Sequence, residues 1–195
     1  MNRAVFLDRD GVINRKAPEG EYILCDEDLE ILPDAPGAIR RLSEAGFLVI
    51  VATNQRCVAK GLLNEDRLEA IHQVMLSRLR AEGARIQAVY YCPHEAEADC
   101  ACRKPKPGML VQAARDHAID LAASWMIGDS LSDAEAGKAA GCRCILLAGA
   151  GAGSHGTASV PWALAGTASV LRDCQVVASL SEAVGYILEC SESAL

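Results

Sequence analysis

Short hydrophobic runs alternate with amphipathic stretches along most of this chain. Continuous hydrophobic runs of this length are typical of strands buried in a parallel sheet. They predict strands at residues 4–7, 47–52, 86–91, 125–129 and 142–147, with a last short one at 176–177. Between them, hydrophobic residues at helical spacing predict helices at about 34–45, 64–82, 108–117, 132–140 and 180–189. This alternation predicts an open, mostly parallel α/β sheet with helices on both faces.

Helix boundaries are marked by capping residues. Asp34 is expected to cap the helix that starts there, and Asn64 the next one.

Two segments lack periodicity. Residues 15–35, called the flap segment below, are polar and irregular and long enough to cover a site. Residues 148–172 are rich in Gly, Ala, Ser and Thr and predict a flexible insertion. We expect residues 1–195 to form one domain.

Composition and charge exclude several classes of protein. The 195 residues carry 19 Lys and Arg against 26 Asp and Glu, a net charge of −7, which argues against nucleic-acid binding through a basic surface. No hydrophobic run reaches membrane-spanning length, and the N-terminus lacks a signal-peptide pattern. We therefore expect a cytoplasmic protein, with no membrane partner, that acts as a monomer. The nine cysteines then favour metal binding over disulfides.

Polar residues follow the predicted strands at the point where each strand ends. Asp8 and Asp10 end the first strand, Thr53 the second and Asp129 the fourth. Ligands of open α/β sheets bind outside these carboxyl ends. Because residues alternate along a strand, Asp8 and Asp10 are expected to point the same way. Paired carboxylates repel unless a cation or a proton lies between them, so the pattern suggests Mg²⁺, a carboxylate nucleophile and an acid–base group. A surface turn is the alternative for this motif taken alone.

A basic loop precedes the helix expected at 108. Lys104 lies between Arg103 and two prolines, in a stiff loop suited to holding an anion. A solvated basic turn is the alternative. Because the loop follows a strand of the same sheet, we expect Lys104 to reach the aspartates, with the hydroxyl of Thr53 completing a phosphate cradle.

Cysteine and histidine gather in the loop before Lys104. Cys92, His94, Cys100 and Cys102 supply three thiolates and one imidazole, a set suited to a closed, tetrahedral, structural Zn²⁺ site. The predicted zinc loop spans residues 92–107. A reduced, partly exposed loop is the alternative. The cysteines at other positions lack such spacing, and we expect five of them to be small buried hydrophobic residues: Cys25, Cys57, Cys142, Cys144 and Cys174.

Four separated motifs resemble, in type and order, those of the haloacid dehalogenase-like phosphatases. They are Asp8-Arg9-Asp10-Gly11, Thr53, Lys104 and Gly128-Asp129 followed by Asp133. The resemblance covers residues 4–147 and implies a Rossmann-like core without a large cap domain. It also implies Mg²⁺-dependent hydrolysis of a phosphate monoester.

The resemblance implies a role for each matching residue. Asp8 would be the nucleophile that becomes an aspartyl-phosphate, and Asp10 the acid and then base, kept protonated by crowded acidic surroundings. Thr53 and Lys104 would hold the phosphoryl group, with Asn54 and Gln55 contacting substrate. Mg²⁺ would be bound by Asp8, the backbone carbonyl of Asp10 and Asp129, with Asp133 supporting the site.

The zinc loop makes the sequence look similar to phosphatases that act on a heptose bisphosphate, and to the related histidinol-phosphate phosphatases. The former act in nucleotide-activated heptose and lipopolysaccharide core biosynthesis, the latter in histidine biosynthesis. A small phosphorylated sugar is therefore the expected substrate, with Arg103 as a contact for a second phosphate or as a support of the zinc loop. In the loop after Thr53, Arg56 and Lys60 depart from the pattern usual in the heptose bisphosphate phosphatases. They suggest either a second phosphate contact or a solvated turn. Histidinol phosphate, another sugar phosphate, a polynucleotide 3′-phosphate and a non-enzymatic zinc-stabilised binding module are the alternatives.

Overall fold

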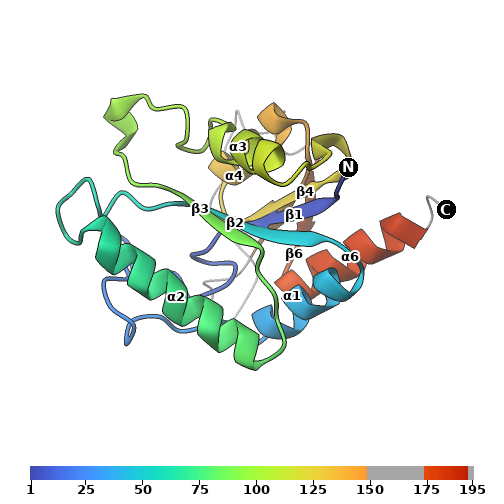
Figure 1. Cartoon of the computed structure of the whole chain (residues 1–195), viewed down its shortest axis with the longest axis horizontal. Helices are drawn as coiled ribbons and strands as arrows, with labels where there is room; N and C mark the ends of the chain where they lie inside the picture. The colour runs from blue at the N-terminus through green and yellow to red at the C-terminus, as the bar shows by residue number, and fades with distance from the viewer. Residues whose placement is uncertain (149–173, 193–195) are drawn as a thin grey trace.

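Six parallel strands form the centre of the molecule. The computed structural model describes residues 1–148 and 174–192 (Figure 1). The strands pair in the order β3-β2-β1-β4-β5-β6, every neighbouring pair parallel. Their bounds are β1 Ala4–Leu7, β2 Leu48–Asn54, β3 Ala88–Cys92, β4 Trp125–Gly128, β5 Arg143–Leu147 and β6 Cys174–Val177. The predicted α/β class is confirmed. The insertion predicted at 148–172 lies, except for its first residue, outside the described residues.

Helices cover both faces of the sheet, as predicted. Their bounds are α1 Ala35–Glu44, α2 Glu65–Ala81, α3 Gly108–Asp116, α4 Leu131–Ala140 and α6 Leu180–Glu192, with 3₁₀ turns at Ala96–Ala98 and Leu121–Ala123. In Figure 1, α3 and α4 lie above the sheet, whereas α1, α2 and α6 lie below it. Most strand bounds differ from the predicted ones by one or two residues, as at β2, which continues to Asn54, and β3, which begins only at Ala88 and includes Cys92.

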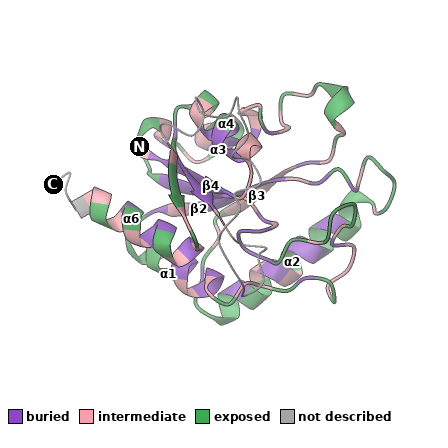
Figure 2. Cartoon of the chain, turned by 180° about the vertical axis from the view of Figure 1, so that it is seen from behind, coloured by how far each residue is buried: buried purple, intermediate pink, exposed green. Residues whose placement is uncertain are grey.

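Alternation along the strands divides the core into two layers. On one side, Val5 and Leu7 of β1 pack with residues of α1, α2 and α6. On the other, Ala4 and Phe6 pack with residues of α3 and α4. Buried residues accordingly run along the strands and the inner sides of the helices (Figure 2). Because both faces are covered, the central strands read as continuous hydrophobic runs rather than alternating ones.

One of the two predicted helix caps is correct. Asn64 accepts a hydrogen bond from the backbone N–H of Arg67 at 2.9 Å, as a cap should. The prediction for Asp34 is wrong, since its side chain makes no capping bond to α1. Its backbone is already helical, with φ −88° and ψ −15°, whereas a capping residue needs an extended backbone. Its carboxylate instead accepts from the N–H of Ser181 at 3.2 Å, which ties the start of α6 to the start of α1.

The cysteines outside the zinc loop follow expectation only in part. Cys57, Cys142 and Cys144 are buried, whereas Cys25 and Cys174 are partly exposed. Cys25 lies in the flap segment, and Cys174 begins the edge strand β6, so neither is enclosed by neighbouring elements. The prediction that these two are buried is wrong.

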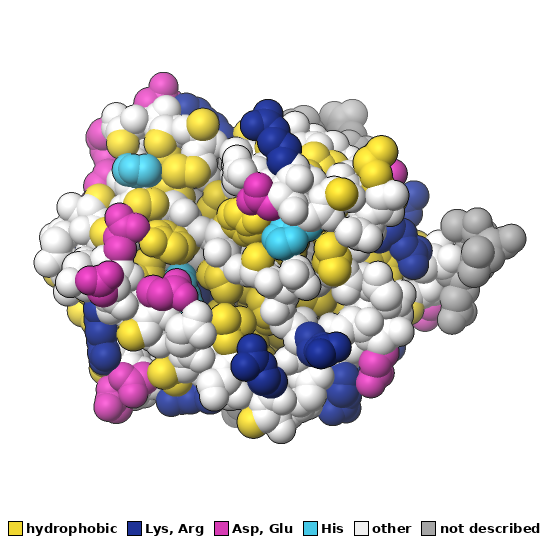
Figure 3. Space-filling view, in the orientation of Figure 1, with side chains coloured by type: hydrophobic (Ala, Val, Ile, Leu, Met, Phe, Trp, Pro, Cys, Tyr) yellow, Lys and Arg dark blue, Asp and Glu magenta, His cyan; other side chains and the backbone are white. Residues whose placement is uncertain are grey.

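The face toward the viewer in Figure 1 carries the β3 edge of the sheet. Hydrophobic side chains lie across its middle, and acidic side chains gather toward the side that carries the start of α2 (Figure 3). None of the helices in the described part of the chain has the length and hydropathy that a membrane crossing needs.

Candidate active site

The strand order defines where a ligand can reach the sheet. The chain runs outward from β1 through β2 to β3, and then from β4 through β5 to β6 on the other side of β1. Such sheets open a crevice beyond the carboxyl ends of the two strands at this reversal, here β1 and β4. Asp8 directly follows β1, and Asp129 directly follows β4. Thr53 lies near the end of the neighbouring β2, so the topology brings these predicted residues to one edge.

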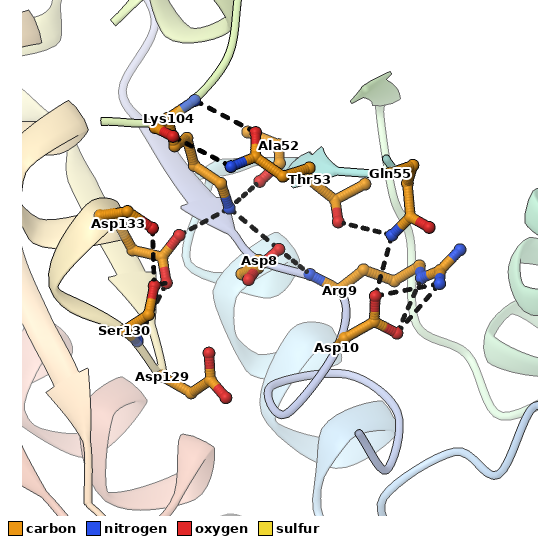
Figure 4. Close-up of polar contacts among 12 residues, drawn as sticks. Asp8, Arg9, Asp10, Ala52, Thr53, Gln55, Lys104, Asp129, Ser130 and Asp133 are labelled. Carbon is orange, nitrogen blue, oxygen red and sulfur yellow. Dashed lines mark hydrogen bonds and ion pairs between the residues drawn. The ribbon is translucent and has the colours of Figure 1, made fainter. Parts of the chain in front are cut away.

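A buried lysine joins the aspartates at this edge. The ammonium nitrogen of Lys104 lies 2.9 Å from Oδ1 of Asp8 and 2.6 Å from Oδ1 of Asp133, and donates to the carbonyl oxygen of Ala52 at 2.7 Å (Figure 4). Only 1% of its side chain is exposed. The backbone N–H of Arg9 donates to the same Asp8 oxygen at 2.7 Å. Lys104 therefore reaches the aspartates, as the loop position predicted.

The charges in this cluster change one another's protonation. Burial raises the pKa of Asp8 to about 7, against the opposing effect of Lys104, and the nearby Asp133 and Asp129 add to the rise. Burial alone would lower the pKa of Lys104, but Asp133 and Asp8 outweigh it and raise that pKa above its ordinary value. Lys104 therefore remains a cation throughout the neutral range, whereas Asp8 gives up its proton near neutrality.

Asp133 is held by the first turn of α4. Its Oδ2 accepts from the backbone N–H of Ser130 at 3.1 Å and from the hydroxyl of Ser130 at 2.6 Å. Two glycines leave room for the aspartate side chains: a Cβ at Gly11 would collide with the Asp129 carboxylate, and one at Gly128 with the side chain of Asp133. Gly11 also has a φ of +86°, in the left-handed region that other residues rarely adopt.

Asp10 departs from two expectations. The chain bends after β1, so Asp10 does not continue the strand alternation, and its carboxylate has other partners than that of Asp8 (Figure 4). It accepts from Arg9 at 3.0–3.1 Å, from Asn14 at 2.9 Å and from Gln55 at 2.8 Å. Burial would raise the pKa of Asp10, but Arg9 and the hydrogen bonds from Asn14 and Gln55 hold it below its ordinary value. The predicted crowded acidic surroundings are therefore wrong for Asp10: donors surround it.

Thr53, Asn54 and Gln55, at the end of β2, link Asp10 and the Lys104 loop to this strand. Thr53 is buried, and its hydroxyl oxygen accepts from Gln55 at 3.0 Å. The amide of Asn54 exchanges two hydrogen bonds with the backbone of Lys104, at 3.0 and 3.1 Å, so it holds the lysine loop in place. Gln55 connects Thr53 to Asp10 through its amide nitrogen.

The acidic residues fit a divalent cation. Carboxylate oxygens of Asp8, Asp129 and Asp133 all lie within 4.8 Å of one another. Oδ1 of Asp129 is buried and has no hydrogen-bond partner among the described residues. Hard cations such as Mg²⁺ take oxygen ligands of this kind, and a cation would give this oxygen the partner that it lacks. Burial, mainly, raises the pKa of Asp129, despite the nearby Lys16.

The flap segment contributes a cation that the sequence did not suggest. The ammonium of Lys16 lies 2.7 Å from Oδ2 of Asp129, with 56% of the lysine side chain exposed. The same segment lines a cavity of about 260 Å³ together with Asp10, Asn54, Arg56 and Arg103. The predicted role of a cover over the aspartates therefore agrees with where this segment lies.

The basic residues around this cavity differ in their contacts. Arg103 donates to the backbone carbonyl of His94 at 3.0 Å, and so contacts the predicted zinc loop as well as the cavity. The guanidinium of Arg56 lies 5.7 Å from the centre of the Tyr22 ring and also lines the cavity. Lys60 lies 5.9 Å from the same ring and 4.0 Å from Glu95.

The predicted zinc ligands lie together. The Cys92–His94, Cys92–Cys100, Cys102–His94 and Cys102–Cys100 pairs have ligand atoms 3.6, 3.5, 3.4 and 3.4 Å apart, with Nδ1 as the histidine atom. Zn–S bonds of about 2.3 Å in a tetrahedron place neighbouring sulfur atoms about 3.8 Å apart, and the shorter Zn–N bond brings nitrogen somewhat closer. The cluster thus has nearly the dimensions of a closed tetrahedral zinc site.

Sequence reasoning did not assign a role to Arg9, Asn14, Lys16 or His72. Arg9 has a partial signal: its position between two motif aspartates places it near the site, although nothing in the sequence indicates that it is buried. His72 also has one, because it lies four residues after Leu68 and three before Met75, on the buried face of α2. Lys16 has none, since it lies in an irregular segment where spacing indicates no neighbour.

Comparisons with known proteins agree with this geometry. Residues 101–174 match the family described as "HAD-hyrolase-like". The chain is 45% identical over 145 residues to D-glycero-beta-D-manno-heptose-1,7-bisphosphate 7-phosphatase of Rhodopseudomonas palustris, covering 71% of this chain and 79% of that protein. It is 40% identical over 148 residues to the protein of the same name in Pseudomonas aeruginosa, covering 75% and 82%. The crystal structure of D,D-heptose 1.7-bisphosphate phosphatase from B. bronchiseptica, complexed with magnesium and phosphate, has a TM-score of 0.83 at 34% identity and covers 96% of this chain and 98% of that one.

Proposed function

Because this chain belongs to the haloacid dehalogenase-like hydrolases and is a phosphatase of that family, we propose that it removes the 7-phosphate of D-glycero-D-manno-heptose 1,7-bisphosphate. In that role it would serve the synthesis of nucleotide-activated heptose for the lipopolysaccharide core. Substantial identity to several proteins that carry this name supports the substrate. The observation that carries the chemistry is the position of Asp8, at the end of β1 between a buried lysine and two further carboxylates.

The first step is attack by Asp8 on phosphorus. An oxygen of the Asp8 carboxylate forms a bond to phosphorus while the bond from phosphorus to the sugar oxygen breaks, leaving an aspartyl-phosphate. A phosphate dianion and a carboxylate repel each other, and Lys104, 2.9 Å from Asp8, offsets part of that charge. The hydroxyl of Thr53, whose oxygen already accepts from Gln55, keeps its proton free to donate to a phosphoryl oxygen.

Asp10 supplies the proton that the departing sugar oxygen needs. Without substrate, the hydrogen-bond donors around Asp10 lower its pKa and favour its charged form. An incoming phosphate dianion adds negative charge next to this carboxylate, which raises its pKa and favours uptake of a proton. In the second step the resulting carboxylate takes a proton from water, the water oxygen bonds to phosphorus, and the bond to Asp8 breaks to release inorganic phosphate.

Asp8, Asp129 and the backbone carbonyl of Asp10 would hold Mg²⁺, with Asp133 beside them. When bound, Mg²⁺ supplies positive charge that stabilises the phosphoryl oxygens. Asp133 keeps Lys104 in place through its 2.6 Å contact, and so orients the lysine toward Asp8.

The rest of the sugar would lie in the cavity beside Asp10. Arg103 at its wall offers a planar fork suited to bidentate binding of the second phosphate. Arg56 lines the same cavity and is a second cation within it. The flap segment would cover the sugar.

Replacement of the nucleophile tests the mechanism. Asp8→Asn should abolish turnover, because an amide does not form the acyl-phosphate, while the circular dichroism spectrum stays unchanged. Asp66→Asn, a change at an exposed position of α2, is the matched control and should keep full activity. Near-normal turnover by Asp8→Asn would refute the assignment.

A substrate panel tests the specificity. We expect the highest kcat/KM for the heptose bisphosphate, compared with histidinol phosphate and simple sugar monophosphates. A preference for histidinol phosphate would replace the proposed substrate and leave the chemistry at Asp8 intact.

A further inference from the structure

A buried polar chain leads from the candidate acid into the core. Among the described residues, Arg9 is the largest fully buried side chain, with 1% of it exposed. Its Nε lies 3.1 Å from Oδ1 of Asp10, and its Nη2 lies 3.0 Å from each of the two carboxylate oxygens. At the other end of the guanidinium, Nη1 lies 3.3 Å from Nε2 of His72 on α2. The planar guanidinium is therefore held at both ends, and its plane is fixed.

The state of His72 follows from its neighbours. Because an arginine can only donate, Nε2 of His72 must accept, and the ring proton lies on Nδ1. That atom is buried and has no hydrogen-bond partner among the described residues. It lies 4.0 Å from Oε2 of Glu69, whose side chain is exposed. Burial, together with the charge of Arg9, lowers the pKa of His72 to about 3, so the ring is neutral and free to accept.

This arrangement is an inefficient way to hold a fold together. Hydrophobic residues of similar volume often stabilise a core as well as a buried ion pair does. A guanidinium and an imidazole with an unsatisfied nitrogen add desolvation cost at this position. What the chain gains is a carboxylate whose two oxygens are fixed in direction, at the wall of the cavity that the substrate would enter.

We propose that His72 is a positioning residue for the reaction: through Arg9 it holds the carboxyl group of Asp10 in the orientation that proton transfer to the leaving alcohol requires. The inference rests on the acid–base role proposed above for Asp10. His72 is fully buried and does not line the cavity that the substrate would enter, so its effect passes through the guanidinium of Arg9. General acid catalysis depends on such geometry before it depends on pKa.

The test compares two leaving groups in His72→Phe, a change that keeps a ring and removes the acceptor. The value of kcat/KM reports the steps up to departure of the leaving group, where the acid acts. A sugar alkoxide needs a proton on departure, whereas p-nitrophenolate does not. A positioned acid contributes about 10²–10⁴-fold, so partial misorientation should lower kcat/KM for the sugar phosphate about tenfold. For p-nitrophenyl phosphate the change should stay within about twofold.

Three further variants make the comparison decisive. Asp10→Asn should show the same selectivity with a larger loss. His72→Gln, whose amide oxygen can accept from Arg9, should restore most of the sugar-phosphate activity. Glu69→Gln, at an exposed position near His72, should leave kcat/KM unchanged for both substrates. If His72→Phe does not yield folded protein, the smaller His72→Leu replaces it, and folding is checked by urea unfolding.

Two results would overturn the inference, and they are distinguishable. Equal losses on both substrates, or no loss, in the His72 variant while Asp10→Asn remains selective would show that His72 is only structural and leave the acid assignment standing. Absence of selectivity in Asp10→Asn itself would remove the acid assignment and this inference with it.

Discussion

Replacement of Lys104 by methionine tests the electrostatics of the site most directly. The change keeps the length of the side chain and removes its charge and its contacts with Asp8, Asp133 and the carbonyl of Ala52, at 2.9, 2.6 and 2.7 Å. Removing one partner of a buried ion pair costs about 3–5 kcal/mol, because the remaining charge stays buried. The lost hydrogen bond to Ala52 belongs to the same network and is not added separately. We therefore expect the free energy of unfolding to fall by about 3–5 kcal/mol.

The assay is urea unfolding followed by circular dichroism at pH 8, where Asp8, with its pKa of about 7, is charged in the folded protein. At pH 5.5 the loss should shrink, because Asp8 takes up a proton and no longer needs a counter-charge. Saturating Mg²⁺ should stabilise the variant more than the wild type, since the cation replaces the missing charge.

The matched control is Lys106→Met, two residues along the same loop. Lys106 pairs with Asp99 on the surface, with 43% and 87% of the side chains exposed. Exposed pairs of this kind contribute about 0–1 kcal/mol. If Lys104→Met lost no more stability than Lys106→Met at pH 8, the reasoning that Lys104 neutralises buried carboxylates would be refuted.

Three further predictions concern separate parts of the molecule. Protein purified without added metal should contain close to one Zn²⁺ per chain, held by the cluster of Cys92, His94, Cys100 and Cys102, and elemental analysis that finds less than about half an equivalent in folded protein would contradict a structural site. Arg103→Ala should lower kcat/KM about tenfold or more for a sugar bisphosphate but little for a monophosphate, because a charge-assisted hydrogen bond contributes about 1.5–3 kcal/mol; equal losses would make Arg103 a support of the zinc loop alone. In the folded protein the pKa of His72 is about 3, whereas in the unfolded chain it is about 6.5. Below about pH 6.5 the unfolded chain therefore binds a proton that the folded protein does not, and the free energy of unfolding should be about 2 kcal/mol lower at pH 5 than at neutral pH. His72→Phe should remove that part of the pH dependence. If the free energy of unfolding, measured with urea, fell as much between pH 7 and pH 5 in the variant as in the wild type, this assignment to His72 would be wrong.

The positions of the site residues along the chain were predictable because parallel strands end at one edge. Asp8, Thr53 and Asp129 each follow a hydrophobic run, and topology alone brings them together. The cluster of Cys92, His94, Cys100 and Cys102 was predictable from residue type, since three thiols and an imidazole in one short loop are a ligand set typical of a metal site. Both inferences depend on residue type and order, which a sequence carries directly.

The orientation of Asp10 was not predictable in this way. Strand alternation suggested that it points with Asp8, but the backbone bends at Arg9, where alternation no longer applies. Arg9 itself is a charged residue outside the strand, and such residues are ordinarily exposed. In its buried position it contacts His72 of α2, a partner 63 residues away that only the folded chain brings near.

The cluster formed by Cys92, His94, Cys100 and Cys102 has a consequence for the residue that follows it. Cys92 is the last residue of β3, and Cys102 precedes Lys104 by two positions. A zinc ion bound there would act as a cross-link that closes a short loop, and so restrict the conformations that the segment before Lys104 can adopt. Much of the entropy cost of fixing the lysine loop would then be met during folding rather than when a phosphate arrives. The zinc ion would thereby preorganise Lys104, a residue that it does not contact.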